Sequence, residues 1–442
     1  MKFVTSAKNI LGFMLKNEGD KKKLSTVILP SFFIHFIAGL LYVLTVLVLT
    51  RKLGAREYGV LTYSFTVISL IISLLLGGIN VMAVREPPAL LSKGQTGLWK
   101  GFYRWSSRIV IVVSILVPLL IAACILFARY YLHLFTSSLY TTPILCALAA
   151  FPFYALMNYY SAWLRGQHKT VLSFLPDNII KPAFFLIVLV CFFHFNLWNA
   201  IWIRDLSFLA GSIFAIATFY RTTKMSSITP EYDIPAWKTS LKSFFLLAAL
   251  VSISSRVDIL MLGFFRDASQ VGIYSGADML ATKIVIFQTL MNQISVASIS
   301  RLHTLNDKKK LQSMMTKITR GVAIVSIPFF IVIILFNKWI LSFLGPAFVQ
   351  GESALIILCT GQLISLAFGP VGNFAVTTKN EKINIVFVIL KMGIAILINL
   401  ILTPIWGING TAIATAASLV FWNAGMFITV KKRTGISTWI FG

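Results

Sequence analysis

The chain has 442 residues, of which 57% are hydrophobic and only 12% charged, whereas an ordinary soluble domain is about 25% charged. Its apolar residues come in blocks of about twenty, the length at which a helix crosses a hydrocarbon layer ~30 Å thick, so the composition predicts an all-α integral membrane protein and excludes a soluble domain. The net charge of +25 does not predict a nucleic-acid partner, because most Lys and Arg lie in short loops and no nucleic-acid-binding motif is present.

Residues 1–26 precede the first apolar block and are rich in Lys. Phe3, Ile10, Leu11 and Met14 share one face of a helix, with Lys residues elsewhere around it. This pattern is typical of a helix that lies on a membrane surface. We therefore expect 1–26 to be a cytoplasmic interfacial segment.

About twelve apolar blocks follow, each long enough to form a transmembrane helix. Their approximate ranges are 27–50, 60–84, 107–128, 141–164, 173–193, 198–220, 240–265, 276–300, 318–343, 352–377, 382–404 and 408–430. When a Lys or Arg at the edge of a block is counted with the adjoining loop, 28 of the 39 fall on the side of the N-terminus and 6 on the other side. Because cytoplasmic loops are enriched in Lys and Arg, this bias predicts that both termini are cytoplasmic.

The connection around 221–239 divides the blocks into two sets of six, predicting an N-terminal lobe over 27–235 and a C-terminal lobe over 236–442. A weak internal repeat agrees with this division. The segment from Leu53 to Ser64 follows the first predicted helix of one half, and the segment from Leu262 to Ser275 follows the first helix of the other. An even number of helices in each half gives the two repeats the same orientation, as in paired transporter lobes.

Several ionisable residues fall inside the predicted spans, where each costs ~2.5–3.5 kcal/mol near the bilayer centre. The cations are Lys181, Arg204, Arg256, Lys283 and Lys391, and the carboxylates are Asp205, Asp258 and Asp278, with Asp177 near the end of a span. Two interpretations remain open. These residues form structural pairs, such as Arg256 with Asp258 or Lys283 with Asp278, or the surplus cations line a polar cavity that receives an anion.

No feature of an enzyme is visible. The predicted outer loops are short, whereas a membrane glycosyltransferase or polysaccharide polymerase needs catalytic groups in a loop large enough to hold a sugar. A nucleophile motif, a metal-ligand cluster and a Walker A sequence for ATP are all missing. We therefore expect a transporter without a cofactor.

Short motifs follow one another in order along nearly the whole chain. They are Arg51-Lys52-Leu53-Gly54-Ala55-Arg56-Glu57-Tyr58-Gly59, Gly77-Gly78-Ile79-Asn80, Val84-Arg85-Glu86, Arg165-Gly166-Gln167-His168-Lys169, Asp258-Ile259-Leu260-Met261-Leu262-Gly263, Val271-Gly272-Ile273-Tyr274, Leu344-Gly345-Pro346-Ala347-Phe348 and Asn380-Glu381-Lys382. In this order and spacing they resemble the polysaccharide-biosynthesis (Wzx-type) flippases of the multidrug/oligosaccharidyl-lipid/polysaccharide (MOP) exporter superfamily. Two departures concern Pro87-Pro88, where that family usually continues as helix, and the absence of a carboxylate in the first helix, which disfavours the drug-extrusion (MATE) branch.

The resemblance implies two six-helix lobes of the MATE/MOP type and alternating access. It also implies a flippase in the cytoplasmic (inner) membrane that moves an oligosaccharide repeat unit on polyprenyl (undecaprenyl) diphosphate to the outer leaflet, for O-antigen of lipopolysaccharide, capsule or exopolysaccharide. We expect Arg204, Arg256, Lys283, Lys391 and Lys181 to line the cationic cavity. Asp258 and Asp278 are candidates for ion coupling, with a Na⁺ gradient, a H⁺ gradient or the membrane potential left open as the drive.

The expected partners are the lipid-linked oligosaccharide, membrane lipids and the polysaccharide polymerase machinery, with a monomer as the default state. A cation-coupled drug antiporter is the alternative function, but it should have an acidic cavity.

Overall fold

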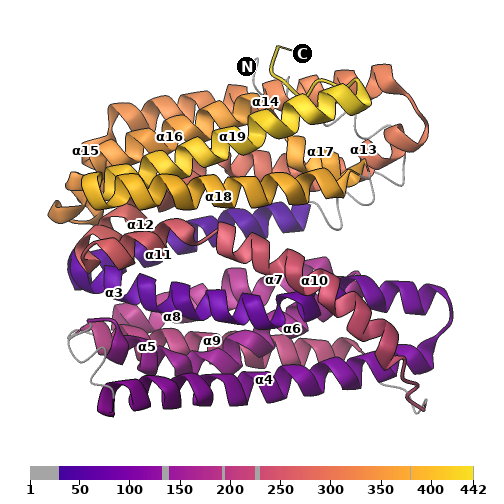
Figure 1. Ribbon diagram of the computed structural model, residues 1–442, viewed down its shortest axis with the longest axis horizontal. Helices are drawn as coiled ribbons and strands as arrows, with labels where there is room; N and C mark the ends of the chain where they lie inside the picture. Colours follow the sequence, from indigo (N-terminus) through magenta and orange to yellow (C-terminus); the bar gives the residue numbers. More distant parts are fainter. Residues whose placement is uncertain (1–28, 132–138, 192–194, 224–228, 379, 442) are drawn as a thin grey trace. The chain divides into compact units, whose positions relative to one another are not determined.

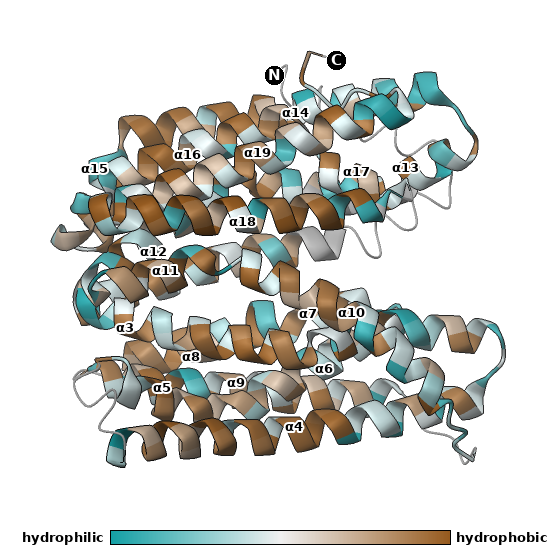
Figure 2. Ribbon diagram, viewed as in Figure 1, coloured by the Kyte–Doolittle hydropathy of each residue, from teal (hydrophilic) through white to brown (hydrophobic). Residues whose placement is uncertain are grey.

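A computed structural model describes residues 29–131, 139–191, 195–223, 229–378 and 380–441. Within these ranges every regular element is a helix, which confirms the predicted all-α class. Ten of these helices are long and apolar enough to cross a membrane, and hydrophobic residues run along them while hydrophilic residues gather at helix ends (Figure 2). The chain is therefore a multi-pass membrane protein. The interfacial helix predicted for 1–26 lies outside the described residues.

Contacts between residues divide the chain into two compact units, one from Pro30 to Arg256 and one from Val257 onward. The helices of the N-terminal unit are α3 (Leu29–Ser92), α4 (Thr96–Tyr130), α5 (Thr141–Ala147), α6 (Phe151–Gly166), α7 (Thr170–Leu175), α8 (Lys181–Cys191), α9 (Leu197–Thr222) and α10 (Ile234–Ser254), with a 3-10 turn at Leu148–Ala150 and a π-helical turn at Pro176–Ile180 (Figure 1).

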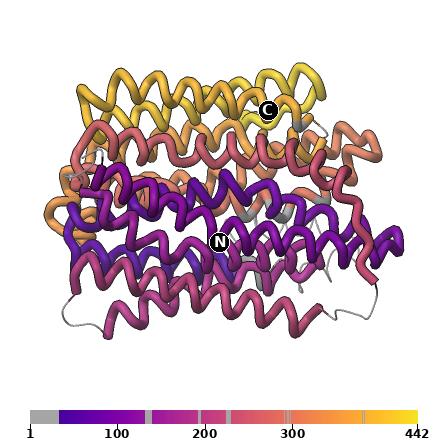
Figure 3. The backbone as a smooth tube through the Cα atoms, turned by 60° about the horizontal axis from the view of Figure 1, so that its bottom comes forward, coloured from indigo at the N-terminus to yellow at the C-terminus, as the bar shows by residue number. Residues whose placement is uncertain are grey.

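The helices of the C-terminal unit are α11 (Val257–Phe265), α12 (Ala268–Thr282), α13 (Ile286–Thr304), α14 (Lys308–Leu335), α15 (Asn337–Leu344), α16 (Glu352–Ala367), α17 (Val371–Thr377), α18 (Glu381–Trp406) and α19 (Ile408–Thr434), with 3-10 turns at Lys283–Val285 and Pro346–Gly351. In this unit α18 and α19 form a hairpin and lie side by side (Figure 1; Figure 3).

Gly54 breaks α3 into two helices, which correspond to the first two predicted spans. Its backbone has φ 70° and ψ 178°, a combination that only glycine adopts readily. No neighbouring atom lies within 4 Å of where a Cβ would stand. The glycine of the motif after the first predicted helix is therefore required by its backbone conformation and not by close packing.

α3 continues through Pro87 and Pro88. From the sequence alone it was undecided whether the helix continues at these two prolines. Prolines lack an N–H, so the carbonyls of Ala83 and Val84, four residues earlier, have no helical donor from these positions. Gly166 lies against the same two carbonyls, and a Cβ there would be 2.4 Å from the oxygen of Ala83. The glycine of the motif after α6 thus permits a close approach of two backbones.

The rest of that motif closes the loop between α6 and α7. Lys169 Nζ donates to Oε1 of Gln167 at 2.8 Å and to the carbonyl of Thr222 at 2.5 Å, so it connects the end of α6 to the end of α9. Gln167 Oε1 also accepts from the hydroxyl of Thr223 at 2.8 Å. Partial burial lowers the pKa of the Lys169 ammonium.

α10 packs with the N-terminal unit, although the sequence analysis placed it in the lobe 236–442. A Cβ added at Gly77 would lie 2.7 Å from Cβ of Ala248, and one added at Gly78 would lie 2.8 Å from the backbone nitrogen of Phe245. Small residues allow α3 and α10 to approach this closely. The boundary given by contacts therefore falls after α10, whereas the predicted lobe boundary falls before it.

The internal repeat has a structural counterpart inside each unit. Lys52, which follows the first predicted helix, donates from Nζ to the carbonyl of Leu189 at 2.9 Å, near the end of α8. Arg266, which follows the first predicted helix of the second half, donates to the carbonyls of Thr403 and Pro404 at 3.2 and 2.6 Å, near the end of α18. Cations stabilise the unpaired carbonyls at a helix C-terminus. Because α8 and α18 are each the fifth predicted span of their half, both halves use the same capping arrangement.

Candidate functional site

Arg204 on α9 lies over an aromatic pair inside the N-terminal unit. Its guanidinium carbon is 4.3 Å from the centroid of the Phe65 ring, close enough for a cation–π interaction. Phe65 stacks on Phe208 with centroids 6.0 Å apart, and Tyr154 packs on Phe208 at 4.5 Å. The side chain of Arg204 is half-buried, and among the described residues it forms no ion pair. Aromatic faces therefore support this cation, and no carboxylate within the described residues lies within 4.0 Å of it.

Lys181 reaches the same aromatic pair from α8. Its Nζ lies 5.0 Å from the centroid of Phe208 and forms an ion pair with Asp177, four residues earlier. Asp177 lies in the π-helical turn that leads into α8. Lys181 is thus a neighbour of Arg204 through Phe208, but its charge is balanced by a local carboxylate.

Asp205 follows Arg204 and is 4% exposed. Adjacent residues on a helix point about 100° apart. In the described structure neither carboxylate oxygen of Asp205 accepts a hydrogen bond, and the residue forms no ion pair with Arg204. The charge of Asp205 acts on the neighbouring Arg204, but the two side chains form no direct pair in the described structure.

Asp258 is held by hydrogen bonds in the C-terminal unit. One carboxylate oxygen accepts from the hydroxyl of Tyr274 at 2.8 Å and the other accepts from the backbone N–H of Ile259 at 2.9 Å. The Tyr274 oxygen also lies 3.0 Å from the hydroxyl oxygen of Thr415, and Tyr274 is fully buried. These bonds connect α11, α12 and α19.

Lys391 and Lys283 belong to the surroundings of this group. Lys391 on α18 is half-buried and near enough to Asp258 for the carboxylate charge to act on its ammonium, yet it forms no ion pair within 4.0 Å in the described part of the chain. The charge of Asp278 acts on Lys283 and on Tyr274. The charges of Asp258 and Asp278 thus both act on the buried Tyr274, and each also acts on one lysine, Asp258 on Lys391 and Asp278 on Lys283.

Arg256 lies between α10 and α11, at a break in what the sequence predicted as one span over 240–265. Its side chain is exposed. Two serine hydroxyls bond back to carbonyls just before the break, Ser252 to Ala248 at 2.7 Å and Ser255 to Ser252 at 2.9 Å. Such bonds compete with the helical ladder and weaken it. Instead of pairing with Arg256, as one interpretation of the sequence allowed, Asp258 accepts from Tyr274 and Ile259.

The candidate cations thus form two groups, one in each unit. Lys181 and Arg204 share an aromatic pair in the first, and Lys283 and Lys391 accompany two carboxylates in the second. Sequence reasoning did not assign Phe65 and Phe208 to the site, because nothing distinguishes them from the other phenylalanines of a chain with 36. Tyr274, by contrast, could have been identified from the sequence, because it is the last residue of the Val271–Tyr274 motif.

Comparison with known proteins identifies related sequences and folds. A family model described as "Polysaccharide biosynthesis protein" matches residues 28–303, more than half of the chain. A probable flippase of Haloferax volcanii, AglR, is 27% identical over 175 residues, which cover 37% of this chain and 35% of that protein. A probable low-salt glycan biosynthesis flippase of the same organism is 23% identical over 219 residues, covering 48% and 45%. The chain therefore matches less than half the length of these curated relatives.

Solved structures resemble the protein over nearly its whole length. An inward-facing multidrug resistance MATE family transporter of the MOP superfamily has a TM-score of 0.71 at 13% identity, with 90% of this chain and 94% of that chain covered. The lipid II flippase MurJ, in an inward closed conformation, has a TM-score of 0.66 at 16% identity, covering 91% and 87%. At such low identity these likenesses show the fold, which is of the MATE type, as predicted.

Proposed function

Because this chain belongs to the polysaccharide biosynthesis protein family, we propose that it is a flippase for a lipid-linked glycan, a transporter and not an enzyme. The proposed substrate is an oligosaccharide repeat unit carried on polyprenyl diphosphate. The proposed movement is from the cytoplasmic to the outer leaflet of the cytoplasmic membrane, in support of the synthesis of O-antigen, capsule or a similar polymer. The names of the similar flippases and the MurJ-like fold support this assignment.

The observation that carries the proposal is the presence of half-buried cations that no described carboxylate pairs. Arg204 and Lys391 are two such cations inside membrane-spanning helices, one in each unit, and no described hydrogen bond to a helix-end carbonyl accounts for either. An unpaired charge within a membrane-spanning helix is costly unless it faces water or a ligand of opposite charge. A diphosphate supplies such a charge, whereas a cationic drug would be repelled. The chemistry therefore favours an anionic substrate.

In the proposed mechanism Arg204 and Lys391 contact the diphosphate or acidic sugars, while the lipid tail stays in the bilayer. Lys181, Lys283 and Arg256 would contribute weaker, longer-range attraction, because Lys181 is paired, Lys283 is influenced by Asp278, and Arg256 is exposed. The two lobes would open to alternate leaflets, as repeated transporter halves do.

In this proposal the membrane potential contributes drive without a coupled ion. A head group with two negative charges that moves outward across an inside-negative potential of ~100 mV moves down the electrical gradient, which favours the movement by roughly 4–5 kcal/mol. Coupling to Na⁺ or H⁺ through Asp258 or Asp278 is a separate proposal. For such coupling, the hydrogen bonds from Tyr274 and Ile259 would hold the Asp258 carboxylate in place. If transport continues unchanged after the Na⁺ and H⁺ gradients are collapsed, the coupling proposal fails while the flippase proposal stands.

The test is a flipping assay with purified protein in liposomes and a fluorescent polyprenyl-diphosphate sugar. We expect the wild type to move the lipid and the variants Arg204→Ala and Lys391→Ala to lose most of this activity. The matched controls are Arg104→Ala and Lys382→Ala, which remove exposed cations, the second of them on the same helix as Lys391. These controls should retain wild-type rates.

Two outcomes would contradict the proposal. If the wild type leaves the lipid unmoved but exports a cationic dye, the fold assignment stands and the substrate class is wrong. If all four variants lose activity to the same extent, the general positive charge of the protein matters and the interior cations have no special role.

A further inference from the structure

The short helix α15 presents an exposed apolar face. At 100° per residue, Phe336 at its N-cap and Trp339 and Phe343 within it fall within roughly 60° of one another around the helix. All three side chains are exposed, Trp339 at 62%. The rings of Trp339 and Phe343 pack edge to face with centroids 4.5 Å apart. The three residues therefore form one aromatic surface.

The other two faces of α15 differ from this aromatic face. Leu341 and Leu344 are buried, and Cδ1 of Leu344 would lie 3.1 Å from a Cβ added at Gly276 of α12. Lys338 lies on a third, polar face, where its ammonium is 3.4 Å from a carboxylate oxygen of Glu352 while its side chain is 70% exposed. One face of α15 thus packs on the protein and one is polar, so the aromatic face is left for an apolar partner.

The aromatic face continues a stripe of exposed apolar residues on α14. Ile324, Ile327, Ile331 and Leu335 are exposed and follow one another at intervals of three or four residues, which puts them on one side of the helix. The next interval of four reaches Trp339. Because α14 is long and apolar enough to cross a membrane, exposed apolar side chains along it meet lipid acyl chains. The surface that α14 offers to lipid therefore runs on to the aromatic face of α15.

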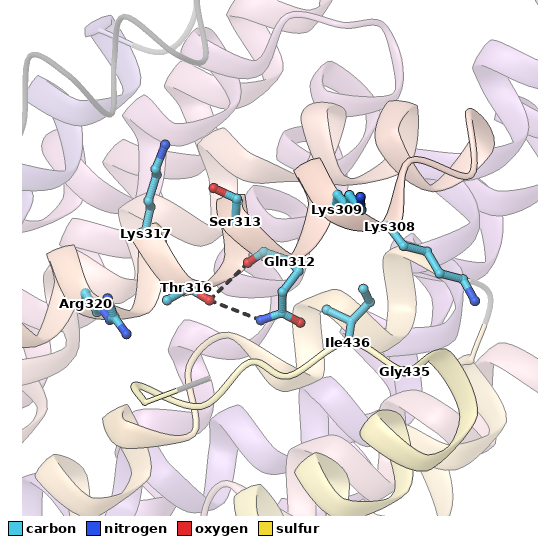
Figure 4. A pocket seen from close by; sticks show the side chains of 9 residues that line it. All are labelled: Lys308, Lys309, Gln312, Ser313, Thr316, Lys317, Arg320, Gly435 and Ile436. Carbon is cyan, nitrogen blue, oxygen red and sulfur yellow. Dashed lines mark hydrogen bonds between the residues drawn. The ribbon is translucent and has the colours of Figure 1, made fainter.

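The length of α14 places α15 at a membrane surface. Charged side chains line the first half of α14, beside a cavity of about 580 Å³; they are Lys308, Lys309, Lys317 and Arg320 (Figure 4). Since charged residues avoid the hydrocarbon layer, the apolar run begins after them. This run, Gly321 to Leu335, is about 22 Å long at 1.5 Å per residue, roughly 8 Å short of a hydrocarbon layer of ~30 Å. α15 begins where the run ends, at the opposite end of the C-terminal unit from α13 and α17 (Figure 1).

We propose that α15 is an interfacial helix whose partner is the phospholipid bilayer. Phe336, Trp339 and Phe343 lie among the upper carbons of the acyl chains, and Lys338 reaches the head groups. Tryptophan suits this position because its ring is apolar while its N–H can still bond to head groups or water. Amphipathic helices lie in the interface in this way. The sequence analysis instead predicts a single transmembrane span over 318–343.

Other partners fit the aromatic face less well. A soluble protein would not explain why this face continues a surface that lies inside the membrane. A second copy of the chain would cover the face and exclude lipid from it, which the experiment distinguishes. Because Leu344 packs at Gly276, contact of α15 with lipid also joins the membrane surface to α12, the helix that carries Tyr274. The proposal holds for any transported substrate and is independent of the proposed flippase function.

The experiment measures the depth of Trp339 in the membrane by quenching of its fluorescence. Full-length protein is reconstituted into phosphatidylcholine vesicles whose lipids carry bromines either high in the acyl chains, near the head groups, or low, near the bilayer centre. Acrylamide is the quencher in water. The Trp339 signal is the difference between the wild type and Trp339→Phe, and it should lose more emission to the high bromines than to the low bromines or to acrylamide. If Trp339→Phe fails to fold, Trp339→Tyr serves for the same subtraction.

Two other tryptophans are matched controls, each measured by its own variant, Trp406→Phe or Trp163→Phe. Trp406 ends the spanning helix α18 and is 56% exposed, so it should show the same pattern as Trp339. Trp163 is fully buried and should be quenched by neither brominated lipid.

Three results would overturn the proposal. Strongest quenching of Trp339 by the low bromines would make α15 the end of a transmembrane span. Strongest quenching by acrylamide would place the aromatic face in water. Protection from all three quenchers would show that protein, such as a second copy of the chain, covers this face.

Discussion

At the scale of single residues, the carboxylates inside the helices differ in how the protein accommodates them. Asp258 receives hydrogen bonds on both oxygens, whereas Asp205 is 4% exposed and receives none within the described structure. A satisfied carboxylate can remain among apolar residues because its hydrogen bonds offset part of the lost hydration. Asp258 is satisfied, unlike Asp205, in part because the buried hydroxyl of Tyr274 donates to it. The same hydroxyl also links Asp258 to Thr415.

We expect Tyr274→Phe to lower the thermal stability of the purified protein, because it removes a buried donor and leaves an acceptor unsatisfied, a loss of about 1–3 kcal/mol. Thr415→Val should cost less, since it leaves the bond between Tyr274 and Asp258 intact. The measurement is thermal unfolding of both single variants, of Asp258→Asn and of Asp258→Asn/Tyr274→Phe. If the double variant Asp258→Asn/Tyr274→Phe loses as much stability as its two single variants together, the two side chains do not interact.

At the scale of helices, interruptions of the helical backbone determine whether a nearby charged residue is buried or exposed. Hydropathy predicts one helix over each of 27–50 and 240–265, but the second is two helices, α10 and α11, because hydropathy carries no information on backbone geometry. Gly54 ends the first helix through its φ of 70°, and the seventh predicted span is interrupted between Ser254, where α10 ends, and Val257, where α11 begins. Arg256 is exposed because it lies at this interruption.

Gly54→Ala should destabilise the protein by about 1–3 kcal/mol, because alanine is strained at this φ and ψ although space for its Cβ is available. Gly393→Ala is the matched control. Gly393 also has no atom within 4 Å of a Cβ position, but it lies within α18, where alanine is favoured by about 0.5–1 kcal/mol. Thermal unfolding should therefore shift in opposite directions for the two variants. A shift of both to higher temperature would mean that Gly54 is not constrained as described.

At the scale of the whole molecule, the capping of α8 by Lys52 and of α18 by Arg266 supports two halves with related architecture. Since these caps occupy equivalent places in each half, they are expected at the same side of the membrane. The Lys and Arg count predicts that this is the outer side and that both termini are cytoplasmic.

The topology can be measured by labelling single cysteines in intact cells with a maleimide that does not cross membranes. In a background with Cys124, Cys146, Cys191 and Cys359 replaced by Ala, we expect Lys338→Cys to be labelled and Lys238→Cys to be labelled only after permeabilisation. Both side chains are exposed, so access and not burial decides the result. The reverse pattern would invert the predicted orientation.

The sequence by itself determined the class, the approximate spans and the identity of the charged residues, because apolar length and charge are local properties that a bilayer selects directly. It also indicated the family through motifs such as Arg51–Gly59, which the match over residues 28–303 confirms. Only the tertiary structure decided the partners. Phe65 reaches Arg204 across more than a hundred residues of chain, Phe208 reaches Lys181 from the next helix, and Tyr274, not Arg256, bonds to Asp258. Gln312 bonds to Ser437, also more than a hundred residues away. Side chains in apolar spans look alike in sequence, and only packing determines which of them face a charge and which face lipid.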